Sequence, residues 1–318
     1  MRTGIVGFGN IGKKHQQALN SLSDFKLVAI CDQNPSDEID QNLYYGSIDG
    51  LLKNAQEIDL ISICTPNHLH EAHCVKALNN GLHVICEKPF ALTGPSCQNI
   101  IDASRSNGRQ VFCVMQNRFS GVSQWLKDLI EHDILGNIYF VNVACYWNRS
   151  SSYYLGSEWR GQKDKDGGTL FTQFSHYVDT LFWLFGNLNV NNALFKNFNH
   201  VDTIDFEDSC TFNFNMNNGA IGSFSYTTSS YNKNFESTLT IIAQRGTIKI
   251  SGQYMNEIEY CDIEGIDKHP FLPSDNIANL SKVYRNAKDV ILNNAKPMTS
   301  AEDGLAVVSI IESVYDYK

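Results

Sequence analysis

The sequence has no uninterrupted apolar run that approaches the length of a membrane span. Glycines interrupt the first apolar stretch, so the N-terminus lacks the charged-then-apolar plan of a signal peptide. Basic residues are in the minority, since 25 Lys and Arg face 34 Asp and Glu and the net charge is -9. A general nucleic-acid binder would show the opposite balance. We therefore expect a cytoplasmic protein whose partners are small molecules, not nucleic acids or membranes.

Nine cysteines are present, but none form a C-x-x-C pair, and most lie inside apolar, strand-like runs. This pattern favours small core residues in a reducing compartment over disulfides or a zinc site. The 318 residues suffice for two domains, and they contain no repeat, low-complexity tract or flexible linker. We expect a two-domain protein without a metal site.

The chain begins with a pattern that is typical of dinucleotide-binding domains. An apolar strand, residues 3–6, leads into a G-x-G-x-x-G loop, and a helix, a strand over 26–31 and Asp32 follow. The loop consists of Gly7, Phe8, Gly9, Asn10, Ile11 and Gly12. Its glycines let a pyrophosphate approach backbone N–H groups at the helix N-terminus, while Asp32 can accept ribose hydroxyls. The alternative is a tight glycine turn with no ligand.

The residues after Asp32 bear on the choice between NAD and NADP. Gln33, Asn34 and Pro35 offer no basic side chain for a 2′-phosphate. Lys13 and Lys14 weaken this argument slightly. We therefore predict NAD as the cofactor, with NADP less favoured.

Strands and helices then alternate, which predicts a doubly wound parallel sheet. Strands are expected over 59–64, 82–86 and 110–115, with helices over 70–79 and 94–106 between them. Ligands of such sheets bind beyond the carboxyl ends of the strands. The candidate cofactor residues at these ends are Thr65, Pro66, Asn67, His70, Glu87 and Lys88.

Lys88 is the most informative of these residues. A lysine at a strand end beside the nicotinamide position can polarise a hydroxyl or carbonyl oxygen and take part in proton transfer. Pro89 would fix the turn that aims it. The alternative is a surface lysine that pairs with Glu87.

A strongly apolar helix is expected over 169–185, because Gly167 and Gly168 precede it and Gly186 follows it. A helix that is apolar nearly all round is expected to be buried. Yet polar residues at spacings of three and four share one of its faces, namely Thr169, Thr172, Gln173, His176 and Asp179. Buried polar groups need partners, which a ligand pocket would supply. The alternative is an internal hydrogen-bond network around a core histidine.

We expect the first domain to comprise residues 1–117. The pattern changes after it, and residues 118–318 are expected to form a second, α+β domain. A helix over 122–132 precedes strands over 136–147, 207–216, 219–228, 236–244, 247–252 and 256–262. Consecutive hairpins imply a large, open, mostly antiparallel sheet. One face would cover the polar helix, and the other is available for another subunit. A terminal helix over 299–317 would pack back on the first domain.

The segment before the polar helix, residues 146–165, combines aromatic rings with two arginines. Its candidate substrate residues are Arg149, Tyr153, Tyr154, Trp159 and Arg160. Aromatic faces suit a sugar or a base, and arginine forks suit a carboxylate or phosphate. The alternative is a solvated loop with a few anchoring rings.

Four motifs stand in one order: Gly7-x-Gly9-x-x-Gly12, Thr65-Pro66-Asn67-x-x-His70, Glu87-Lys88-Pro89 and the helix after Gly167. With them, the chain resembles the Gfo/Idh/MocA oxidoreductases along essentially its whole length. The resemblance implies a Rossmann domain followed by a domain with a large open mixed sheet. It also implies NAD(P)-linked oxidation of a sugar or cyclitol hydroxyl, and homodimers or homotetramers formed through the open sheet.

The family's catalytic lysine corresponds to Lys88 and its histidine to His176. The resemblance implies that His176 accepts the hydroxyl proton as general base while Lys88 hydrogen-bonds the same oxygen. Gln173 and Thr172 would hold neighbouring hydroxyls. Many members carry an aspartate four residues before the histidine, where this chain has Thr172. Asp179 would orient the imidazole instead, or serve only as a structural partner.

Within the family, Asn148-Arg149, Tyr153-Tyr154 and Trp159-Arg160-Gly161 resemble the branch that oxidises UDP-N-acetylglucosaminuronate at its 3-hydroxyl for surface polysaccharide synthesis. Arg149 or Arg160 would then bind the uronate carboxylate, and the other arginine or Lys163 a diphosphate. Two alternatives stay open. One is a dehydrogenase of a free sugar or inositol, and the other is a non-catalytic protein that senses a sugar or NAD.

Overall fold

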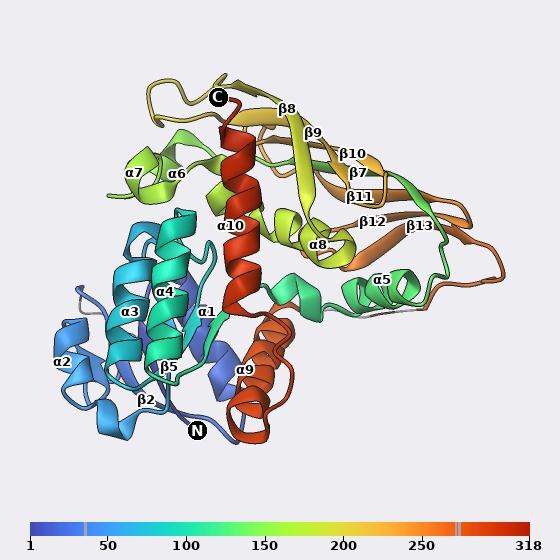
Figure 1. Ribbon diagram of the computed structural model, residues 1–318. Helices are drawn as coiled ribbons and strands as arrows, with labels where there is room; N and C mark the ends of the chain where they lie inside the picture. The colour runs from blue at the N-terminus through green and yellow to red at the C-terminus, as the bar shows by residue number, and fades with distance from the viewer. Residues whose placement is uncertain (35–36, 271, 273–274) are drawn as a thin grey trace. The chain divides into compact units, whose positions relative to one another are not determined.

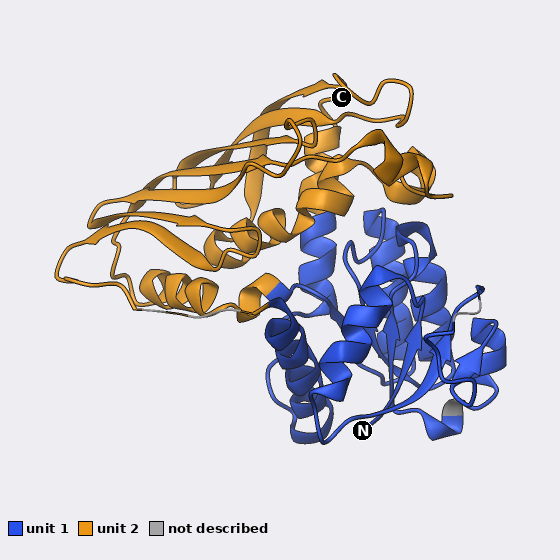
Figure 2. Cartoon of the chain, turned by 180° about the vertical axis from the view of Figure 1, so that it is seen from behind, with its two compact units in different colours: residues 1–116, 276–308 blue, residues 117–275, 309–318 orange. Residues whose placement is uncertain are grey.

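The computed structural model describes residues 1–34, 37–270, 272 and 275–318, so Pro35 lies outside the described residues. The chain forms two compact units (Figure 2). The first unit comprises residues 1–116 and 276–308, and the second comprises 117–275 and 309–318. The C-terminal segment is therefore divided between the units, whereas the sequence suggested a single boundary near residue 117.

The first unit is built on a parallel sheet of order β3-β2-β1-β4-β5-β6, which confirms the predicted doubly wound fold (Figure 1). Every residue of β4 is buried, as expected for a strand covered on both faces. Its strands are β1 Arg2–Val6, β2 Lys26–Cys31, β3 Tyr44–Tyr45, β4 Leu60–Ile63, β5 His83–Cys86 and β6 Val111–Cys113. Its helices are α1 Asn10–Asn20, α2 Ile48–Leu52, η1 Ala55–Glu57, η2 Asn67–Leu69, α3 His70–Asn79, α4 Gly94–Ser106 and α9 Asn276–Asn293.

Helix α9 was not predicted from the sequence, although it completes the first unit. It packs on α1 and buries one stripe at helical spacing, Leu280, Val283, Tyr284, Ala287 and Val290. Two polar contacts fasten it to the end of α1: the Ser281 and Ser21 hydroxyls lie 2.9 Å apart, and Lys288 pairs with Asp24. A segment far along the chain thus covers the helix that follows the glycine loop.

The second unit is built on a sheet of order β13-β12-β11-β7-β10-β9-β8, in which only β7 and β10 run parallel. The predicted open, mostly antiparallel sheet is confirmed. Its strands are β7 Ile138–Tyr146, β8 Leu188–Lys196, β9 Ser209–Met216, β10 Ile221–Thr227, β11 Glu236–Ala243, β12 Gly246–Ser251 and β13 Glu257–Ile263. Its helices are η3 Gln116–Phe119, α5 Gly121–Glu131, α6 Ser151–Leu155, α7 Lys163–Asp166, η4 Leu170–Phe174 and α8 Ser175–Phe185, while α10 Ala301–Tyr315 carries residues of both units. Edge strand β8 was missed because its three asparagines are atypical of strands.

Buried and more exposed side chains alternate along β9 and β10, so the second sheet has one buried face. Phe224 and Tyr226 lie on it, and the helical segment of η4 and α8 packs there, with Phe174 5.1 Å from the Tyr226 ring. The opposite face exposes Leu194, Ile221 and Tyr260. This face is the one expected to pair with another subunit, and that pairing stays a prediction. No helix in the described part of the chain combines the length and apolarity needed to cross a membrane.

Candidate functional site

The three glycines of the first loop have three different surroundings. Gly7 has φ of +91°, and a Cβ on it would lie 2.6 Å from the carbonyl oxygen of Cys64. A Cβ on Gly12 would overlap the carbonyl oxygen of Gly7. At Gly9, by contrast, no described atom lies within 4 Å of the Cβ position. Two glycines thus allow close backbone packing, and the third leaves space where a pyrophosphate would approach.

The surroundings of this loop suit an anionic dinucleotide. Helix α1 starts after Gly9 with no side-chain cap and no acidic residue in its first turn, so its first N–H groups can receive a phosphate. The backbone N–H of Phe8 donates to the Asp32 carboxylate over 2.6 Å, which places that carboxylate beside the loop. Lys13 pairs with Glu38 at 2.7 Å and is thereby neutralised in part.

His70 joins the loops that follow two neighbouring strands, β4 and β5. It is buried; its Nδ1 lies 2.7 Å from the carbonyl oxygen of Pro89, and its Nε2 lies 2.9 Å from that of Thr65. Burial lowers the pKa of His70, against the raising effect of these two carbonyls. The Lys88–Pro89 peptide bond is cis. His70 therefore holds the lysine turn in place, and both its ring nitrogens already face protein oxygens.

A buried chain of hydrogen bonds lies behind Lys88. The Glu87 carboxylate accepts from the Lys88 backbone N–H over 3.1 Å and lies 2.9 Å from His15 Nε2. His15 Nδ1 lies 2.6 Å from the Tyr284 hydroxyl, which lies 2.6 Å from the Ser62 hydroxyl. An ionised carboxylate only accepts hydrogen bonds. The chain can therefore be satisfied if Ser62 donates to Tyr284, Tyr284 donates to His15, and His15 donates to Glu87. The Glu87 side chain itself is buried.

The polar helix of the second unit begins with a wide turn. Residues 170–174 form the π-helix η4, and α8 follows from Ser175 to Phe185. Gly186, whose φ is +82°, comes directly after the helix. His176 lies in the first turn of α8 and is half-buried. Thr169 donates to the carbonyl of Glu207 over 2.6 Å, and Thr172 donates to Asp166. These polar residues have internal partners, as the alternative reading of the sequence required.

Asp179 is the structural partner of Arg118. The guanidinium donates three hydrogen bonds to the carboxylate, the shortest of them 2.5 Å long. The side chains are only 2% and 0% exposed. A buried ion pair with this geometry compensates two charges that would each be costly alone. Asp179 is therefore a buried structural partner of Arg118, and its role in orienting His176 stays a prediction.

Four of the five predicted substrate residues in the preceding segment lie together. The centres of the guanidinium groups of Arg149 and Arg160 lie 5.4 and 4.5 Å from the Tyr153 ring. Arg160 also lies 5.3 Å from Trp159. Neither guanidinium has a carboxylate partner among the residues that the structure describes. Two such cations beside aromatic rings form a group suited to an anionic ligand.

Gln173 links this group to the polar helix, and the Tyr154 ring contacts the Tyr153 ring edge-on, with 5.0 Å between the ring centres. Arg149 Nε donates to the Gln173 side-chain oxygen over 2.8 Å, and the Gln173 amide donates to the Tyr153 hydroxyl over 2.9 Å. Tyr154 is buried in a small core with Ile204 and Phe206. Gln173 thus fixes the side chains of Arg149 and Tyr153 by hydrogen bonds. Tyr154 anchors the same segment by packing into the small core.

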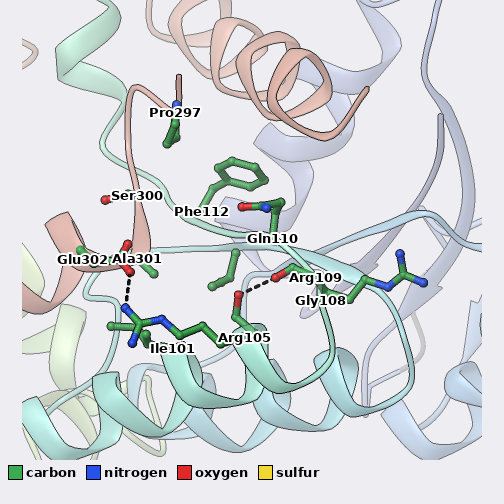
Figure 3. A pocket seen from close by; sticks show the side chains of 12 residues that line it. Ile101, Arg105, Gly108, Arg109, Gln110, Phe112, Pro297, Ser300, Ala301 and Glu302 are labelled. Atoms are coloured by element: carbon green, nitrogen blue, oxygen red, sulfur yellow. Dashed lines mark hydrogen bonds and ion pairs between the residues drawn. The ribbon is translucent and has the colours of Figure 1, made fainter. Parts of the chain in front are cut away.

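A pocket of about 260 Å³ lies elsewhere in the first unit, among α4, the segment before β6 and the start of α10 (Figure 3). Gly108 and Gln110 line this pocket at the amino end of strand β6. The predicted cofactor residues instead follow the carboxyl ends of the strands, at the other edge of the sheet. Arg105 and Glu302 form an ion pair of 3.1 Å in the pocket (Figure 3). No predicted site residue lines this pocket. Within the described ranges, no group of three or more His, Cys, Asp or Glu side chains is arranged to hold a metal ion.

Two family models match the chain. Residues 1–115 match the oxidoreductase family with an NAD-binding Rossmann fold, and residues 123–249 match the GFO/IDH/MocA C-terminal domain. Together these models cover most of the chain. The chain belongs to the Gfo/Idh/MocA oxidoreductases. Its first unit contains an NAD-binding Rossmann domain, which confirms the predicted family, fold and cofactor.

Solved structures with similar folds include two dehydrogenases. The WlbA dehydrogenase from Bordetella pertussis, in complex with NADH and UDP-GlcNAcA, is 29% identical, with a TM-score of 0.89 over 100% of this chain and 96% of that chain. The WlbA dehydrogenase from Chromobacterium violaceum, in complex with the same two ligands, gives the same identity and TM-score over 93% of its chain.

Curated relatives carry several names. The D-glucoside 3-dehydrogenase of Escherichia coli K12 is 28% identical over 64% of this chain and 59% of its own length. The inositol 2-dehydrogenase of Salmonella typhimurium LT2 is 28% identical over 58% of this chain and 54% of its own length. The alignments thus span less than two thirds of these relatives. Because their names differ in substrate, membership of the family does not fix the substrate of this chain.

Proposed function

We propose that this protein is an NAD-dependent dehydrogenase that oxidises a secondary hydroxyl of an anionic sugar, namely the 3-hydroxyl of a UDP-linked N-acetylhexuronic acid. The observation that carries the proposal is the group formed by Arg149, Tyr153, Trp159 and Arg160 beside the polar helix. A uronate carboxylate and a diphosphate are the anions that guanidinium forks prefer. The likeness to two WlbA dehydrogenases bound to NADH and UDP-GlcNAcA supports the same substrate class.

NAD accepts the hydride when it is bound, and the chain supplies position and proton transfer. In this proposal the N-terminus of α1 and Gly9 receive the pyrophosphate, and Asp32 receives the ribose hydroxyls. His176 accepts the proton of the substrate hydroxyl, because an imidazole titrates near working pH. Lys88 donates a hydrogen bond to the same oxygen and stabilises its developing negative charge.

Substrate recognition then falls to the second unit. Arg149 or Arg160 binds the uronate carboxylate, and the other arginine or Lys163 binds the diphosphate. Gln173 acts chiefly by holding Arg149 and Tyr153. The exposed face of the sheet, with Leu194 and Ile221, serves a homo-oligomer. The cellular role that fits is cytoplasmic sugar-nucleotide oxidation for surface polysaccharide synthesis.

The test compares Lys88→Ala and His176→Ala with the wild-type protein. Both variants should keep wild-type affinity for NADH and lose about 10²–10⁴-fold in turnover of UDP-N-acetylglucosaminuronate. His132→Ala, at an exposed histidine of the second unit, is the matched control and should turn over normally. Undiminished turnover in both variants would contradict the roles given to Lys88 and His176.

The substrate is tested separately by thermal shift with NADH and a panel of ligands, since a ligand that binds the native state raises its apparent stability. UDP-N-acetylglucosaminuronate should stabilise more than free sugars or inositol. A response to inositol alone would favour the free-polyol alternative. Binding of a sugar in the presence of NAD⁺ without any rise in absorbance at about 340 nm, the reduced-nicotinamide band, would favour a non-catalytic sensor.

A further inference from the structure

His200, in the loop between β8 and β9, has an acceptor at each ring nitrogen. The side chain is buried. Its Nε2 lies 2.7 Å from the carbonyl oxygen of Arg149, and its Nδ1 lies 3.1 Å from the Asp208 carboxylate. A carbonyl oxygen and an ionised carboxylate can only accept hydrogen bonds. A neutral imidazole has one N–H, so it can satisfy only one of these contacts, whereas an imidazolium satisfies both.

The surroundings of Asp208 require its ionised form. Its carboxylate accepts from the backbone N–H groups of Phe198 and Asn199 over 2.9 and 2.8 Å. The Ser209 and Ser229 hydroxyls donate to it over 2.7 and 2.8 Å. Although burial acts to raise the pKa of Asp208, the hydrogen bonds from His200 and these neighbours hold it well below its usual value. Asp208 is thus a fully buried anion that needs a nearby cation.

We propose that His200 is a positioning residue for the anionic substrate: as an imidazolium it clamps the backbone carbonyl of Arg149 and thereby sets that arginine toward the sugar's negative group. The hydrogen bond with Asp208 raises the pKa of His200, against the lowering effect of burial, and the Arg149 carbonyl raises it further. No sequence motif marks His200, because Asp208 and Arg149 reach it from separate segments.

Arg149 is held by contacts to both its backbone and its guanidinium. Its backbone N–H donates to the carbonyl of Thr228 over 2.8 Å, on the opposite side of the residue from the His200 contact. Its guanidinium donates to Gln173 and, over 2.7 Å, to the carbonyl of Asn148. A recognition group fixed before binding loses less entropy when the ligand arrives. Loss of the His200 clamp should therefore weaken substrate binding and leave the chemistry unchanged.

The pH dependence follows from the groups that face His200. Among the described residues these are Asp208, Arg149 and Tyr154, whose ring lies 5.2 Å away edge-on. Burial raises the pKa of Tyr154, so it stays neutral. Folding raises the pKa of His200. The imidazolium, and with it the hydrogen bond to the Arg149 carbonyl, is therefore fully present below about pH 6.5, the usual histidine value. It is lost as the pH rises through the raised pKa. KM for the anionic sugar should increase over that range.

The charge is tested without substrate, by ¹⁵N NMR of histidine-labelled protein at pH 6.5, with His200→Gln used to assign the signal. Two protonated ring nitrogens are expected, and a neutral ring would overturn the proposal. This measurement does not depend on the proposed function. It therefore still applies if UDP-N-acetylglucosaminuronate proves not to be a substrate.

The positioning role rests on the proposed function and is tested by kinetics. His200→Gln should raise KM for UDP-N-acetylglucosaminuronate about tenfold, with little change in kcat or in NADH affinity. His132→Gln, at an exposed histidine, is the matched control. An unchanged KM in a folded His200→Gln protein would overturn the proposal. If that variant does not fold, the proposal is tested by measuring the KM of the wild-type protein between pH 6.5 and 9. A KM that does not change over this range would overturn the proposal.

Discussion

At the scale of single residues, Gly9 and Gly12 look equivalent in the sequence but are not equivalent in space. We predict that Gly9→Ala leaves folding unchanged, since no described atom lies near the added Cβ. The same Cβ would occupy the space where the pyrophosphate approaches the loop. NADH affinity, measured by fluorescence titration, should fall roughly tenfold, or about 1.4 kcal/mol.

Gly12→Ala is the contrasting control, because its Cβ would overlap the carbonyl oxygen of Gly7. That variant should show a lower melting temperature even without cofactor. Wild-type NADH binding by a folded Gly9→Ala protein would show that the space at Gly9 is not where the cofactor lies.

Residues within one local motif were predictable, and residues joined across the chain were not. The glycine loop, Asp32 and Lys88 follow strand ends, and a parallel sheet brings strand ends to one edge. His15 and Glu87 are 72 positions apart, and no spacing rule connects them. Asp179 illustrates the same limit, because its carboxylate binds Arg118, 61 positions earlier, and no spacing rule connects the two.

At the scale of elements, the π-helix η4 explains why the polar face of the predicted helix is divided. A π-turn holds more residues than an α-turn, so spacings of three and four across it no longer mark one face. Thr169 reaches the carbonyl of Glu207, whereas Gln173 reaches Arg149. The glycines on either side predicted the length of the helix well, since the segment from Thr169 to Phe185 is helical. They could not predict the wide turn.

Helix α9 provides a prediction about stability. Tyr284→Phe removes the hydroxyl that lies 2.6 Å from both His15 and Ser62, inside the core of the first unit. Buried polar groups that lose a partner cost about 1–3 kcal/mol. The free energy of unfolding, from urea denaturation followed by circular dichroism, should fall by that amount.

Tyr231→Phe is the matched control, because Tyr231 lies in the segment between β10 and β11 and is 89% exposed. Its effect should stay within about 0.5 kcal/mol. Equal stabilities of the two variants would show that the hydrogen-bond chain behind Lys88 contributes nothing to the fold.

At the scale of the whole molecule, all nine cysteines are free thiols, and all but Cys64 and Cys261 are buried. Burial raises the pKa of Cys31 and Cys210 to about 12, from an ordinary 9.0. Because the thiolate is the reactive form, their reactivity at pH 8 should fall roughly thousandfold.

We therefore predict slow labelling of the native protein by a chromogenic disulfide reagent, beginning with Cys261, and rapid labelling of every thiol in denaturant. A fast native phase that consumes most thiols would contradict the burial pattern. The sequence supported the same view of the cysteines through their place in apolar runs.

The division of the C-terminal segment has a consequence for synthesis. Helix α9 covers α1 in the first unit, while Tyr315 stacks between Phe171 and Phe195 in the second. A nascent chain that has left the ribosome only as far as residue 275 therefore lacks one packing element of each unit, namely α9 in the first and Tyr315 in the second. Neither core can close until the segment after residue 275 has been synthesised, and until then the exposed apolar surfaces of both are substrates for chaperones.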